Sequence, residues 1–156
     1  MKSKIASLAI ILGATFYVSG AHAAETVNVE ADQMEVIDAE HRTVFKGNVI
    51  AVRPKDSIKS DVMIVTSSDV KQPDGTMKSV TDLLDAVGNV VITTKTQTIT
   101  GSAAKFYIQK DKLEVTGNVI LVQGTSTIKG TFLKVDLKTN RLQMTGGRVQ
   151  SSFVPK

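Results

Sequence analysis

The 156-residue sequence contains no cysteine and no tryptophan, and aromatic residues make up only 4% of it. Without cysteine the chain cannot form disulfide bonds, so its stability must come from strand pairing and apolar burial. The scarcity of aromatic residues argues against nucleic acid as a ligand, because proteins that bind nucleic acids usually have a concentrated basic face with stacking aromatic side chains. We therefore expect neither disulfides nor nucleic-acid binding.

Metal-binding and catalytic patterns are also scarce. The chain has two histidines, His22 and His41, and no cysteine, so a zinc or other soft-metal site is not expected. It has no nucleophile elbow, phosphate loop or metal-ligand spacing. Clustered carboxylates can support acid–base catalysis, but strand spacing puts Glu35 opposite Met34 and Val36, on the solvent side. The cluster comprises Asp32, Glu35, Asp38 and Glu40. We expect no enzyme and no cofactor.

The first 23 residues have the three parts of a secretory signal peptide. Residues 1–4 are basic, residues 5–18 form an apolar run, and an Ala-x-Ala step ends at Ala23. The run is shorter than the ~20 residues that a membrane-spanning helix needs, although an uncleaved anchor is the alternative. Cleavage after Ala23 would leave residues 24–156 as one domain and, by removing Lys2 and Lys4, lower the net charge from +4 to +2.

An internal repeat organises the rest of the chain. Gly-Asn-Val occurs at residues 47–49, 88–90 and 117–119, and Gly-Gly-Arg-Val at residues 146–149 is a degenerate fourth copy with Arg148 in place of valine. Upstream of each copy lies an apolar-x-small-x-x-apolar-x-apolar pattern. It starts at Val29, Ile58, Ile99 and Ile128. The shared frame defines a 29-residue unit present four times, with 12 additional residues in the second copy.

The spacing within each unit is typical of β-strands. Apolar and polar residues alternate with a period of two, as in Leu-Glu-Val-Thr at residues 113–116. The step from the small residue to the next apolar one is three, so both face inward only if the chain bends there. The small residues are Ala31, Ser60, Gly101 and Gly130. Gly-Asn suits a second bend, and the additional residues of copy two, around residues 67–75, have the composition of a loop.

A stack of such units has an unpaired edge at each end, and exposed edges recruit further strands. Neither end is strongly protected by proline or charge. The edge residues are Thr26, Val27, Asn28 and Val29 at one end and Arg148, Val149 and Gln150 at the other. We therefore expect head-to-tail strand pairing into a homo-oligomer that can continue as a filament.

Several of these motifs resemble the LptA/OstA-like family of periplasmic lipopolysaccharide transport proteins. They are Val-x-Val-Glu-Ala-Asp at residues 27–32, Phe-Lys-Gly-Asn-Val at 45–49, Leu-x-Val-x-Gly-Asn-Val at 113–119 and Ile-Lys-Gly at 128–130. The resemblance covers essentially the whole chain after the leader. It implies an all-β fold: an open, V-shaped β-jellyroll of stacked antiparallel strands built from about four 29-residue repeats.

The resemblance also implies a function in the periplasm. The acyl chains of lipopolysaccharide would lie in the apolar interior, and modules joined head to tail would bridge an inner-membrane LptC-type protein and an outer-membrane LptD-type translocon. By position, Val27 and Val29 match the family's N-terminal strand, and Phe106 and Ile108 match a lipid-facing strand. The expected lipid-facing residues of the inner face are Val27, Val29, Met34, Val36, Phe45, Met63, Val65, Ala104, Phe106, Ile108, Val115, Leu133 and Val135.

Two alternatives remain open from the sequence. A structural, self-assembling β-solenoid of the cell envelope would have the same repeat but a closed interior, and a membrane-anchored LptC-type member of the family would keep its apolar leader. Some basic residues could meet lipid phosphates, although a solvated outer face is the simpler interpretation of each. They are Lys46, Arg53, Lys55, Lys59, Lys105 and Lys110. Of these, Arg53 and Lys55 flank Pro54 at a unit junction, a rim position.

Overall fold

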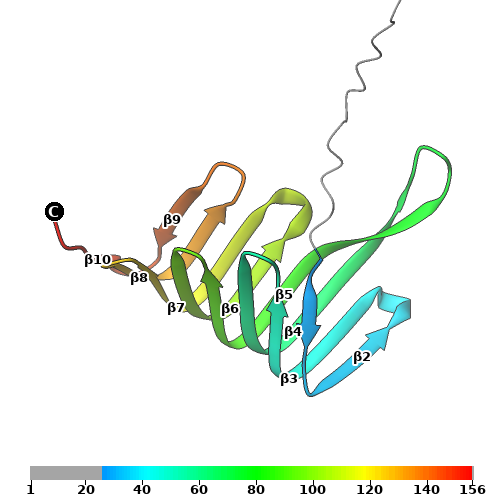
Figure 1. Cartoon of the computed structure of the whole chain (residues 1–156), viewed down its shortest axis with the longest axis horizontal. Helices are drawn as coiled ribbons and strands as arrows, with labels where there is room; N and C mark the ends of the chain where they lie inside the picture. The colour runs from blue at the N-terminus through cyan, green and yellow to red at the C-terminus, as the bar shows by residue number, and fades with distance from the viewer. Residues whose placement is uncertain (1–25, 156) are drawn as a thin grey trace, which may run out of the picture.

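The computed structural model describes residues 26–155, so the predicted signal peptide, residues 1–23, lies outside the described residues. Within residues 26–155 the chain forms one antiparallel sheet of ten strands (Figure 1). The strands are β1 (Asn28–Glu30), β2 (Gln33–Ile37), β3 (Arg42–Val52), β4 (Asp56–Lys71), β5 (Met77–Thr94), β6 (Gln97–Tyr107), β7 (Lys112–Gln123), β8 (Ser126–Asp136), β9 (Arg141–Thr145) and β10 (Gln150–Ser152). Two single turns of 3-10 helix, η1 (Asp38–Glu40) and η2 (Ile108–Lys110), connect strands. Across the described range, no helix has the length and apolar character to cross a membrane.

The long strands bend where the sequence has Gly-Asn. In β3 and β4 the register runs from Lys46 opposite Val62 to Val49 opposite Ser60, so two residues of β3 face one of β4. The same irregularity recurs between β5 and β6 and between β7 and β8. The glycine and asparagine of each step have positive φ, a conformation that these two residue types adopt at low cost. The bulges line up from strand to strand, and we call this line the corner line.

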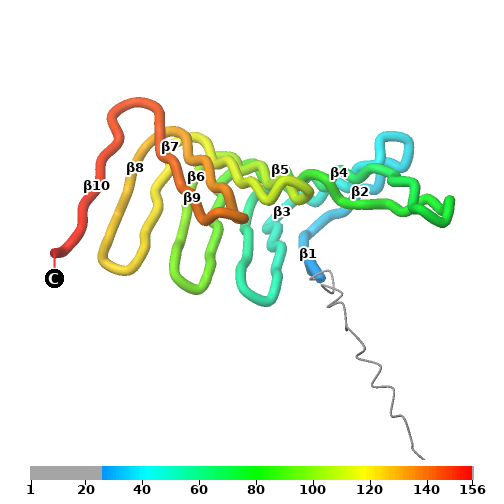
Figure 2. The backbone as a smooth tube through the Cα atoms, turned by 90° about the horizontal axis from the view of Figure 1, so that it is seen from above, coloured from blue at the N-terminus to red at the C-terminus, as the bar shows by residue number. Residues whose placement is uncertain are grey.

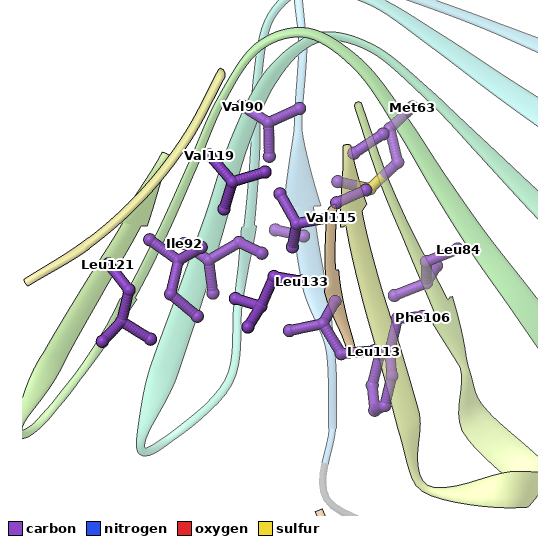
Figure 3. Close-up of a cluster of buried hydrophobic side chains, with 14 of the residues drawn as sticks. Met63, Leu84, Val90, Ile92, Phe106, Leu113, Val115, Val119, Leu121 and Leu133 are labelled. Atoms are coloured by element: carbon purple, nitrogen blue, oxygen red, sulfur yellow. The ribbon is translucent and has the colours of Figure 1, made fainter. Parts of the chain in front are cut away.

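The corner line divides the sheet into two arms that fold toward each other, with apolar side chains between them (Figure 3). Arm A consists of β2, β9 and residues 42–46, 62–71, 77–87, 103–107, 112–116 and 132–136. Arm B consists of β1, β10 and residues 49–52, 56–60, 90–94, 97–101, 119–123 and 126–130. The sheet stays open, since β1 and β2 lie at one end and β9 and β10 at the other. The predicted open, V-shaped β-fold of stacked antiparallel strands is confirmed.

Each repeat bends twice along the chain, once at the small residue and once at Gly-Asn, as predicted, and strand register aligns the two bends on the corner line. Val90 lies opposite Gly101 and Val119 opposite Gly130 across neighbouring strands. Gly101 is small because a Cβ there would lie 2.6 Å from Cγ1 of Val115, a side chain of the other arm. The small residues therefore make room at the apex of the V, where the two arms are closest.

The additional residues of the second repeat extend a hairpin. β4 continues to Lys71 and β5 begins at Met77, with Ser67 paired to Thr81. The hairpin projects beyond the other strands (Figure 1). The loop predicted around residues 67–75 was therefore wrong for residues 67–71, because pairing with β5 satisfies backbone groups that the polar composition alone would leave to solvent.

The fourth copy also differs from the prediction. Gln150 of β10 lies opposite Lys129, which is also the partner of Ile120 in β7. Val149, one residue earlier, thus takes the place that valine has after Gly-Asn in the other copies. Arg148 is an additional residue in this bend. The prediction that Arg148 takes the place of valine in the fourth copy was therefore wrong.

Candidate functional site in the interior of the V

Arm A presents two rows of mostly apolar residues to the interior. Strand register places the members of each row side by side, on the same face of the sheet. The first row is Met34, Phe45, Met63, Ala86, Ala104, Val115, Leu133 and Met144, and the second is Val36, Thr43, Val65, Leu84, Phe106, Leu113, Val135 and Leu142. Ten of the thirteen residues predicted to face lipid are thereby brought together on arm A.

The other three lie elsewhere. Val29 is in β1 and belongs to the corresponding row of arm B, and Ile108 in η2 packs against the buried cluster. Val27 precedes β1. The sequence-based selection overlooked most of arm B, where Ile92, Leu121 and neighbouring side chains face the same interior (Figure 3). The signal for them was present, since they follow each Gly-Asn-Val step at a spacing of two.

Burial along the interior decreases toward the first strand. Met63, Val115 and Leu133 are fully buried, whereas Met34 and Val36 are 64% and 56% exposed. Met34 and Val36 lie on β2, which pairs with β3 on one side and has no strand on its other side within the described residues. Their exposure is therefore a property of the sheet edge, because the same rows are buried further along the sheet.

A small apolar cavity lies between the arms at the mouth of the V, the side opposite the corner line. Its volume is ≈ 70 Å³. Its apolar lining comes from both arms: Ile58, Ile92 and Ile99 from arm B, and Phe106, Leu113 and Val135 from arm A. Figure 2 shows the β3–β4, β5–β6 and β7–β8 turns in a row along the end of arm B. The mouth is thus bounded by hairpin turns on one arm.

Arg53 lies at this mouth, in the turn between β3 and β4. Its Nε and Nη2 donate hydrogen bonds to Oδ1 and Oδ2 of Asp56 at 2.7 and 2.5 Å. Its Cζ lies 5.0 Å from the ring centre of Phe106, a residue of arm A. Arg53 and Asp56 both line the apolar cavity. The rim position expected for Arg53 is therefore observed, together with a contact to the opposite arm that sequence spacing gave no means of finding.

The other basic candidates lie away from the mouth, apart from Lys55 in the same turn as Arg53. On the outer face of arm A, Nζ of Lys46 is 3.9 Å from Glu35, and Nζ of Lys105 is 3.7 Å from Asp85. Lys59 is exposed on the outer face of arm B, and Lys110 lies beside the ring of Tyr107. These four lysines therefore lie on the outside of the V.

The carboxylate cluster near the first strand is dispersed in the structure. Glu35 faces solvent on the outer side of β2, as expected from strand spacing. Asp32 accepts a hydrogen bond from Nδ2 of Asn48 at the corner line, and Asp38 and Glu40 belong to η1. His41 ends that turn with a φ of 50°, and its Nδ1 lies 4.0 Å from Oδ2 of Asp69. Within residues 26–155 no three potential metal ligands come together.

The two predicted edges lie at opposite ends of the sheet (Figure 2). Asn28 and Val29 belong to β1, whereas Thr26 and Val27 precede it. At the other end Gln150 begins β10, and Arg148 and Val149 form the bend between β9 and β10. Each edge is thus a short, bent strand pair with an open outer side.

The fold and sequence were compared with known proteins. A family model described as LptA/(LptD N-terminal domain) LPS transport protein matches residues 28–145. The crystal structure of LptH, the LptA homologous periplasmic component of the lipopolysaccharide transport device of Pseudomonas aeruginosa, is similar with a TM-score of 0.70. The two chains share 13% identity, over 84% of this chain and 96% of LptH, so this likeness concerns the fold. The search of curated proteins found no significant match.

Proposed function

Because this chain belongs to the LptA/(LptD N-terminal domain) family of lipopolysaccharide transport proteins, we propose that it is a periplasmic carrier whose V shields the acyl chains of lipopolysaccharide. The observation that carries this proposal is the apolar inner face, which runs from β2 to β9 on arm A and is matched by arm B. Transfer of acyl chains from water to such a surface gains about 0.8 kcal/mol per methylene. The protein would hold the lipid and carry out no reaction on it.

Lipid binding would require the arms to separate. The cavity of ≈ 70 Å³ at the mouth is smaller than the engineered cavities of about 150 Å³ that hold one benzene molecule. An acyl chain therefore has to replace contacts between the arms rather than fill an existing void. The lipid-facing residues would be the thirteen predicted ones, with Ile92 and Leu121 added from arm B.

Photo-crosslinking in cells that export lipopolysaccharide tests the carrier function. A benzophenone amino acid at Phe106 should capture lipopolysaccharide, because this residue lies at the mouth between the arms. The same probe at Val122, whose side chain is on the outer face of β7, is the matched control and should capture none. If neither Phe106 nor other mouth positions such as Leu113 and Val135 yield an adduct, the interior is only a core and the self-assembling β-solenoid becomes the better reading.

Head-to-tail assembly would extend the carrier into a bridge. Within the sheet, Ala86 pairs with Ala104 and Leu84 with Phe106. Applying this register to the ends places Met144 and Leu142 of one copy beside Met34 and Val36 of the next, which would cover the two most exposed inner residues of arm A. We propose that such a chain of modules connects an LptC-type protein in the inner membrane with an LptD-type translocon in the outer membrane.

The proposed location is the periplasm, reached after cleavage following Ala23. N-terminal sequencing of the protein from cells should then begin at Ala24. Retention of Met1 and the apolar leader would contradict cleavage and favour the membrane-anchored, LptC-type role within the same family.

A further inference from the structure

Arg53 connects the two arms at the mouth of the V. Its backbone N–H donates to the carbonyl oxygen of Asp56 at 2.8 Å, which closes the β3–β4 turn at the end of arm B. From this turn the guanidinium reaches Phe106 on arm A, at 5.0 Å from the ring centre. The side chains of Arg53 and Asp56 are 27% and 24% exposed, so the pair is partly withdrawn from water. The Arg53 side chain therefore contacts Asp56 at the end of arm B and Phe106 on arm A.

We propose that Arg53 gates access to the interior of the V and favours amphiphiles that carry a phosphate next to their acyl chains. This inference rests on the proposed function, in which the interior holds acyl chains. It adds that Arg53 moves aside when the ligand enters and then binds the phosphate of its headgroup.

The closed position of the gate follows from the contacts of Arg53. Guanidinium–carboxylate pairs with two parallel hydrogen bonds are among the stronger polar contacts in proteins, and a cation over an aromatic face adds to them. Phe106 is buried beneath the guanidinium, beside Leu113 and Val135. An acyl chain that inserts at this mouth has to displace Arg53 from the ring, because the cavity behind it is too small to admit the chain unchanged.

The preference for phosphate follows from what Arg53 loses when the gate opens. Moving away from Phe106 also strains or breaks the two hydrogen bonds to Asp56. A phosphate next to the acyl chain offers oxygen atoms in the geometry that a guanidinium fork accepts, so it can replace the carboxylate. A neutral headgroup offers no such replacement. Lys55, exposed in the same turn, adds a second positive charge at the rim.

Ligand displacement on the purified mature protein tests the gate. N-phenyl-1-naphthylamine, bound in the interior, is displaced by dodecyl phosphate or by dodecyl maltoside, each below its critical micelle concentration. Wild-type protein should prefer dodecyl phosphate by about tenfold, the scale of one hydrogen-bonded charge pair. Arg53→Met should bring this ratio close to one, by weakening dodecyl phosphate and leaving dodecyl maltoside unchanged or tighter.

Asp56→Asn should change the affinity for dodecyl phosphate in the opposite direction to Arg53→Met. This variant therefore separates gating from a merely structural role of the Arg53–Asp56 pair. It removes the carboxylate that competes for Arg53, so binding of dodecyl phosphate should tighten. Arg53→Lys, which keeps the charge without the fork, should give an intermediate ratio. Lys59→Met, which removes one exposed cation from the outer face of the same arm, is the matched control and should leave the ratio unchanged. Circular dichroism would verify that each variant is folded.

Two outcomes would overturn the gate. One is a wild-type ratio that persists in Arg53→Met, and the other is weaker binding of dodecyl phosphate by Asp56→Asn. Failure of wild-type protein to bind the probe and both amphiphiles would instead contradict the proposed carrier function itself. The two failures are therefore distinguishable in the same measurement.

Discussion

At the scale of single residues, each bend of the sheet pairs a glycine with a polar side chain of the preceding strand. Nδ2 of Asn48 donates to Asp32 at 2.9 Å. In the third repeat Oγ of Ser102 instead donates to the carbonyl oxygen of Gly117 at 3.3 Å. The position after the small residue thus closes the bend, with carboxylates in the first two repeats and hydroxyls in the last two. The sequence pattern reveals Gly-Asn but not this polar partner, because the partner is distant in the chain and varies in residue type.

Gly88 tests the bend, with Gly75 as its control. The two have similar φ, +84° and +86°, but a Cβ at Gly88 would lie 2.4 Å from Oδ2 of Asp61, whereas one at Gly75 would meet nothing within 4 Å. Gly75→Ala should cost about 1–2 kcal/mol of unfolding free energy for its backbone conformation alone. Gly88→Ala should cost about 1 kcal/mol more, because Asp61 must move and lose its hydrogen bond from Asn89. Equal costs in urea denaturation would show that Asp61 adjusts freely.

Ser60 is a polar residue at an apolar position. It is 5% exposed, and within the described part of the chain its Oγ has no hydrogen-bond partner. Ala31 occupies the equivalent place in the first repeat, so Ser60→Ala should fit and raise stability by about 1 kcal/mol. Ser102→Ala should lower stability instead, since that hydroxyl donates to Gly117. Opposite shifts of the thermal midpoint are expected, and a loss in Ser60→Ala would contradict the assignment.

At the scale of elements, the repeat predicted which strands pair and where they bend. Alternation sets the inner face, and the 29-residue frame fixes the order of the strands, because both patterns act locally. The repeat did not predict three features of the structure. The hairpin extension has a polar composition, the single corner line depends on register between strands, and the contact of Arg53 with Phe106 depends on how the arms fold together. These are long-range properties, so local pattern could not supply them.

The turn of the β4–β5 hairpin should loosen in acid. Oδ1 of Asp74 accepts hydrogen bonds from Oγ1 and N of Thr76 at 2.6 and 2.9 Å, and these bonds lower the pKa of Asp74 below its ordinary value, the side-chain bond most. A lowered pKa means that the ionised form stabilises the turn. This contribution is complete above the ordinary carboxyl pKa, near pH 4, and is lost as the pH falls through the lowered value. The amide resonance of Thr76 should follow this titration by NMR, and it should no longer do so in Asp74→Asn.

At the scale of the whole molecule, the two ends of the sheet carry opposite charge. Residues 28–41, which form the first bent strand and its turn, contain five carboxylates and no lysine or arginine. Residues 141–155 contain two basic residues, Arg141 and Arg148, and no aspartate or glutamate. Complementary charge of this kind steers encounter and disfavours contacts between like ends. Together with the exposed inner residues of β2, it favours a head-to-tail order over symmetric pairing.

Val36 offers the sharpest test of that order. It is 56% exposed on the inner side of β2, so Val36→Lys should leave the monomer folded while placing a charge where Leu142 of the next copy would pack. Val122→Lys makes the same change at a 39% exposed site on the outer face of β7, away from both ends. Sedimentation velocity should show oligomers for wild-type protein and Val122→Lys, and monomers for Val36→Lys. Wild-type oligomers should also dissociate as salt rises, since exposed charges are screened beyond about 10 Å at 0.1 M. Persistent oligomers of Val36→Lys would place the joint elsewhere on the molecule.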